Sequence, residues 1–88
     1  MKGAAANRAL ARAFAEYLGP EECARLDAAC GGRVARLSAR NLAWRLLEGG
    51  AGREEATDRV ALTVAPRAGR DVARRIVEAA AVALDRTR

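Results

Sequence analysis

The sequence predicts an all-α protein: a compact antiparallel bundle of six helices, of which the third is short. Three observations lead to this prediction. Apolar residues recur every three or four positions in each long segment, which is the spacing of one face of a helix. Glycine and proline interrupt the chain at 19–20, 31–32, 49–52 and 66, where helices are expected to end. The β-branched run 60–64 has no partner strand elsewhere in the chain, so a helix is favoured there as well.

The first half of the chain contains three of the expected elements. Residues 4–18 are expected to form the first helix, because large apolar residues line one of its faces. Residues 20–30 are expected to form the second helix, and Pro20 suits its first position, where a missing N–H costs no hydrogen bond. Residues 33–37 form the short third element, either one helical turn or a loop.

The second half contains three further helices. Ser38 is expected to be the N-cap of a helix over residues 39–48, because a serine side chain accepts a hydrogen bond from a free N–H of the first turn. The fifth helix, residues 53–65, begins with acidic residues that favour a helix N-terminus and is ended by Pro66. The sixth helix, residues 69–86, has the longest apolar stripe. Since much of this core must be alanine, we expect modest stability.

The length of 88 residues fits one domain, residues 1–88. This domain is either a whole protein or the N-terminal module of a longer one. No apolar run reaches the length of a membrane span, and the N-terminus lacks the apolar core of a signal peptide. The sequence therefore predicts a cytoplasmic protein without a membrane span.

The composition argues against an enzyme, a metal site or a bound cofactor. There is no histidine and there is a single serine, so the usual catalytic bases and nucleophiles are missing. Gly49–Gly52 is not followed by the residues of a phosphate-binding loop. Cys23 and Cys30 would lie about 10.5 Å apart on one helix, which is too far for a disulfide. They are expected to be small buried core residues.

The charge is basic, with a formal net charge of +5. Fifteen of the sixteen basic residues are arginine, which also fits the composition bias of a GC-rich coding sequence. Between Asp27 and Glu48 there is no acidic residue. We call the four arginines of this stretch the arginine surface: Arg33, Arg36, Arg40 and Arg45.

An acidic surface, Glu54, Glu55 and Asp58, is expected on the same small domain. Two patches of opposite charge on one domain allow head-to-tail association of identical chains. The alternative is that both are ordinary solvated faces. Trp44 lies at the edge of an apolar stripe, where it is either a half-exposed contact residue beside the arginines or a cap on the core.

DNA binding is the alternative function that the sequence suggests. Residues 20–48 can be read as a helix-turn-helix whose second helix presents Arg40, Asn41, Trp44 and Arg45, and arginine and asparagine often contact guanine and adenine. About eight residues would separate the two helices, whereas the motif has a turn of three or four. We therefore expect DNA binding to be weak and non-specific.

Several segments in this order resemble the death-fold superfamily, which includes caspase-recruitment domains and effector-associated domains of bacterial defence proteins. The resemblance rests on residues 12–14, 22–26, 34–37 and 41–50 and on the helix end at 65–66. It implies a six-helix bundle with a short third helix. It also implies a non-catalytic, homotypic recruitment module of a defence or signalling protein.

Overall fold

The described part of the computed structural model, residues 2–64 and 69–88, consists of five helices joined by short turns, and it contains no strand. Side chains are described from residue 5 onward. The helices are α1 (Lys2–Leu18), α2 (Pro20–Cys30), α3 (Arg33–Glu48), α4 (Arg53–Val64) and α5 (Gly69–Thr87). The all-α class is confirmed. The expected helix end at Ala65–Pro66 lies outside the described residues.

The prediction of six helices is wrong. Residues 33–37 and 39–48 form one continuous helix, α3, and Ser38 is an exposed residue in its middle. The reason is that no glycine or proline lies between Arg33 and Glu48. A serine is tolerated inside a helix, so its preference for the N-cap position does not by itself begin a new one.

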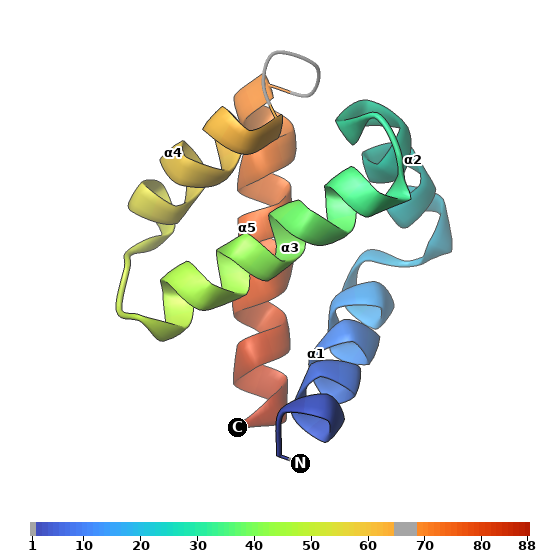
Figure 1. Cartoon of the computed structure of the whole chain (residues 1–88). Coiled ribbons are helices and arrows are strands. Elements are labelled where there is room, and N and C mark those ends of the chain that lie inside the picture. Colours follow the sequence, from blue (N-terminus) through green and yellow to red (C-terminus); the bar gives the residue numbers. More distant parts are fainter. Residues whose placement is uncertain (1, 65–68) are drawn as a thin grey trace.

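Helix α5 is the centre of the packing (Figure 1). Helices α1, α3 and α4 all contact it, and α3 crosses in front of it at a steep angle. Helix α2 contacts α1 and α3. The N-terminal part of α1 and the C-terminal end of α5 lie at the same end of the molecule (Figure 1).

The turn between α2 and α3 is two glycines long. Gly31 and Gly32 have φ angles of 92° and 140°, in the left-handed region that side chains disfavour. The N–H of Gly32 donates to the carbonyl of Asp27 at 2.8 Å, which closes the end of α2. This turn places the first turns of α3 directly against α2.

One apolar core draws residues from all five helices. Eight of its nineteen buried residues are alanine, as expected from the composition. Its two aromatic residues are Phe14 of α1 and Trp44 of α3, whose ring centres lie 6.2 Å apart in an edge-to-face arrangement. This aromatic pair joins α1 to α3.

A polar cluster around Arg75 joins α5 to α1 and α2. Its guanidinium donates to both carboxylate oxygens of Glu22, at 2.7 and 2.8 Å, and to Glu78 at 2.6 Å. It also donates to the Tyr17 hydroxyl at 3.1 Å and stacks on the Tyr17 ring. These bonds hold the pKa of Glu22 below its ordinary value and raise the pKa of Arg75.

Among the described residues, no helix has the length and apolar character needed to cross a membrane.

Candidate interaction surface

A polar hollow of about 360 Å³ lies between α1 and the second half of α3. We call it the arginine hollow. Three residues expected from the sequence to form a site, Arg40, Trp44 and Arg45, line it together. The remaining lining residues are Asn7, Leu10, Asn41 and Glu48.

Arg40 is the half-buried cation of this hollow. Its guanidinium carbon lies 4.4 Å from the centre of the Trp44 ring and 6.0 Å from that of Phe14. Burial, and to a lesser degree the neighbouring charges of Arg36 and Arg33, lower the pKa of Arg40. Both effects oppose a charge at this position, so an anion nearby would be favourable.

The structure offers Arg40 no carboxylate. Among the described residues it forms no ion pair. Its Nε and Nη2 donate instead to one neutral oxygen, Oδ1 of Asn41, at 3.3 and 3.2 Å. The more buried Arg36 and the similarly half-buried Arg75 both have carboxylate partners, so Arg40 differs from them in this respect.

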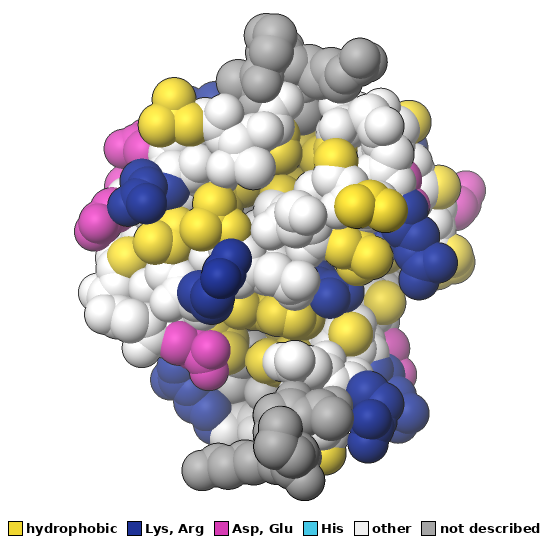
Figure 2. Space-filling model, in the orientation of Figure 1, with side chains coloured by type: hydrophobic (Ala, Val, Ile, Leu, Met, Phe, Trp, Pro, Cys, Tyr) yellow, Lys and Arg dark blue, Asp and Glu magenta, His cyan; other side chains and the backbone are white. Residues whose placement is uncertain are grey.

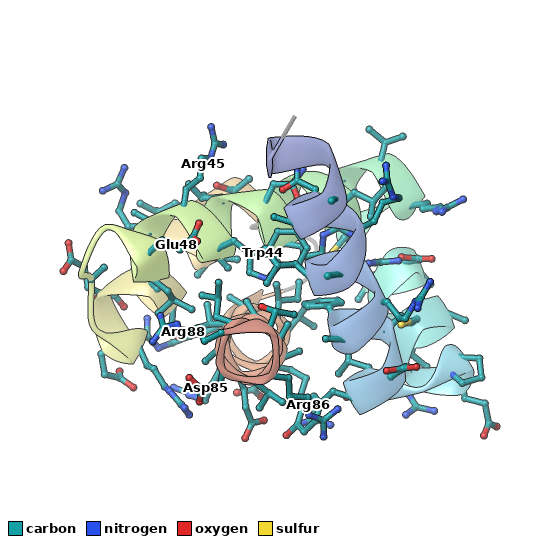
Figure 3. All side chains as sticks on the ribbon, turned by 90° about the horizontal axis from the view of Figure 1, so that it is seen from below. Trp44, Arg45, Glu48, Asp85, Arg86 and Arg88 are labelled. Carbon is teal, nitrogen blue, oxygen red and sulfur yellow. The ribbon has the colours of Figure 1, made fainter. Side chains whose placement is uncertain are left out.

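Trp44 is a core residue and not a half-exposed contact residue. Only 4% of it is exposed, and its side chain lies between α1, α3 and α5 (Figure 3). Its indole N–H is the one buried side-chain polar group without a hydrogen-bond partner in the described part of the chain. An unmade hydrogen bond of this kind costs about 1–3 kcal/mol.

Arg36 does not belong to an exposed arginine surface. It is 7% exposed, and its Nε donates to Asp27 of α2 at 2.6 Å. The absence of acids between Asp27 and Glu48 suggests that nothing nearby neutralises Arg36, and this is wrong. The two-glycine turn folds α3 back against Asp27, an acid that precedes α3 in the sequence.

Arg33 and Arg45 are exposed, and neither forms an ion pair among the described residues. Arg45 points away from the bundle at the rim of the hollow (Figure 3). On the face that α3 crosses, arginine side chains form separate groups with apolar and uncharged surface between them (Figure 2).

The acidic surface is partly neutralised from within. Arg70 of α5 forms ion pairs with Glu54, at 3.0 Å, and with Asp58. Glu55 is exposed and lines a shallow hollow at the turn between α3 and α4 together with Arg45. One residue of each expected surface, Arg45 and Glu55, therefore lies at this turn. Arg70 itself gave no signal in the sequence, since 12 and 16 residues separate it from its partners.

The geometry also changes the helix-turn-helix argument. Because α3 begins at Arg33, only two residues separate it from α2, and the eight-residue gap does not exist. However, the exposed ridge of α3 consists of Val34, Ser38, Asn41, Arg45 and Glu48. This ridge carries one arginine and one glutamate, which is a weak match to a DNA phosphate backbone.

The cysteines are both free. Cys30 is buried as expected, and burial together with Asp27 raises the pKa of its thiol. Cys23 is only partly buried, which differs from the expectation.

Comparison with known proteins identifies no relative: no family model matches the chain, and no curated protein or solved structure matches it. The resemblance to the death-fold superfamily stays a prediction.

Proposed function

We propose that this chain is a non-catalytic protein-interaction module that binds an acidic segment of a partner protein at the arginine hollow. The observation that carries the proposal is the state of Arg40. Its charge is half-buried and held against Trp44, and it has no carboxylate partner among the described residues. A partner that supplies the carboxylate would complete this ion pair.

The acid is more readily supplied by another protein than by the acidic surface of a second copy. Two of its three acids, Glu54 and Asp58, already bind Arg70, so a second copy could offer only Glu55 without breaking an ion pair. The net charge of +5 further favours an acidic partner through long-range attraction.

A protein partner fits the surface better than nucleic acid does. Binding to a phosphate backbone requires several arginines in a row along its path. Here Arg36 is bound to Asp27 and is not available to a phosphate. DNA binding is therefore an outcome that the experiment must separate from the proposal.

The single tryptophan provides a local probe, since Arg40 rests on its ring. We would titrate the protein with a glutamate-rich peptide and with a DNA duplex of equal charge, and follow Trp44 emission at physiological salt. We expect the peptide to bind, and Arg40→Gln to weaken it about tenfold, or about 1.4 kcal/mol.

Arg59→Gln is the matched control, because Arg59 is exposed on α4 and forms no ion pair within the described chain. This variant loses the same charge and should change the affinity less than about threefold. Tighter, sequence-dependent DNA binding that is lost in Arg40→Gln contradicts the proposal. Concentration-dependent oligomers in sedimentation that Arg40→Gln abolishes would instead identify a second copy as the partner.

A further inference from the structure

The bond between Arg40 and Asn41 uses a particular edge of the guanidinium. Nε and Nη2 form the edge with which arginine binds a carboxylate through two parallel hydrogen bonds. In this structure both nitrogens share one carboxamide oxygen, at 3.3 and 3.2 Å, which are long distances for such bonds. The Asn41 side chain therefore occupies a carboxylate position with a neutral, weaker acceptor.

We propose that Asn41 is a placeholder in a carboxylate-binding site, and that an aspartate or glutamate side chain of the partner replaces its oxygen on Arg40. This inference rests on the proposed function and names the chemical group that the hollow recognises.

The exchange is favourable for two reasons. A carboxylate offers one oxygen to each nitrogen, and charge-assisted hydrogen bonds are roughly twice as strong as neutral ones. The displaced Asn41 is exposed, so its amide can bond to water without a buried polar group being left unpaired.

The site is also held in position before the ligand arrives. The Arg40 guanidinium rests on Trp44, which is itself fixed edge-to-face against Phe14. Little side-chain freedom remains to be lost on binding, and this reduces the entropic cost.

Asn41→Asp is the decisive variant. It keeps the shape of the side chain and places a carboxylate of the chain itself on Arg40. We expect the affinity for the glutamate-rich peptide to fall at least about tenfold. Ser38→Asp is the matched control: it adds the same charge to the exposed ridge of α3, and should weaken binding less than about threefold.

Two further variants test the role of the Nε and Nη2 nitrogens of Arg40. Asn41→Ala vacates the position and should leave the affinity unchanged or raise it. Arg40→Lys retains the charge but lacks the paired nitrogens, so the affinity should fall about as far as in Arg40→Gln. If Arg40→Lys binds like the wild type, only the charge matters and the inference is wrong.

Small probes separate this inference from the proposed function. Acetate should shift Trp44 emission in the wild type but not in Asn41→Asp. If the peptide binds Asn41→Asp as tightly as the wild type, the inference fails and the proposed function stands. If no peptide binds but acetate shifts Trp44 emission in an Asn41-dependent way, the carboxylate site stands and the proposed function fails.

A further pair of peptides tests the choice of an acidic side chain. A peptide whose only carboxylate is its free C-terminus should bind less well than one with an internal glutamate and an amidated end. Equal or tighter binding would contradict that choice.

Discussion

Arg75 and Arg40 both rest on aromatic rings, but only Arg75 is neutralised by carboxylates. Arg75 stacks on Tyr17 and is bound by two glutamates and a hydroxyl from three helices. Arg40 stacks on Trp44 and has one asparagine oxygen. The same motif, a guanidinium on a ring, thus stabilises the fold at Arg75 and leaves a charge available for a partner at Arg40.

A net charge of +5 therefore does not indicate which arginines are available to a partner. Arginines that form ion pairs with acids serve mainly to hold helices together, so their substitution should lower the free energy of unfolding. Substitution of an arginine without such a partner should instead lower the affinity for a binding partner.

The largest expected effect is that of Arg36→Glu, which tests whether an arginine of α3 belongs with Arg75 or with Arg40. It would place a buried carboxylate against Asp27, and we expect the free energy of unfolding to fall by about 3–5 kcal/mol. Urea denaturation measures this loss. The double variant Asp27→Arg with Arg36→Glu should recover part of it; an unchanged midpoint for Arg36→Glu alone would show that the arginine is a free surface residue.

Arg75→Gln should lower the free energy of unfolding by about 1–2 kcal/mol, because it leaves the half-buried Glu22 carboxylate without its charged partner. Arg74→Gln is the control, since its ion pair with Asp71 is exposed and should be worth less than about 0.5 kcal/mol. Equal losses in the two variants would contradict the stabilising role of the Arg75 cluster.

The same cluster predicts a dependence on pH. Because the folded protein holds the pKa of Glu22 below its ordinary value of 4.5, its stabilising contribution is complete above pH 4.5. The contribution is lost as the pH falls from there through the lower pKa of the folded state. Urea midpoints measured at decreasing pH should therefore fall less steeply in Arg75→Gln than in the wild type. Parallel curves for the two proteins would mean that other acids determine the pH dependence of stability.

The smallest expected effect on stability is that of Arg40→Gln. The variant loses a stacking interaction of about 0.5–1 kcal/mol but also removes a half-buried, unpaired charge. We expect the midpoint of thermal unfolding to change little while peptide affinity falls. A stability loss equal to that of Arg75→Gln would abolish the distinction between the two arginines.

The helices could be predicted from the sequence because their signals are local. Apolar spacing and the glycine and proline breaks gave four of the five helices to within about two residues, and Ser38 misled because a cap preference was read as a break. The ion pairs could not be predicted in the same way. Arg36 meets Asp27, and Arg75 meets Glu22 across 53 residues, so only the folded arrangement brings them together.

The candidate site likewise has one part that the sequence predicts and one part that it does not. The cluster of Arg40, Trp44 and Arg45 follows from helical spacing on α3 alone, and the structure keeps these residues around one hollow. The opposite wall, Asn7 and Leu10 of α1, has no sequence signal that links it to α3. Helical periodicity predicts which residues share a face, but it does not say which other helix that face meets.

The two-glycine turn between α2 and α3 also bears on the order of folding. It closes a loop of nine residues between Asp27 and Arg36, whereas the Arg75 cluster closes one of 53. Loop closure of the longer segment costs about 1.6 kcal/mol more in chain entropy. We therefore expect the α2–α3 hairpin to form early and α5 to dock late, so that the Arg75 cluster mainly slows unfolding and contributes little to the rate of folding.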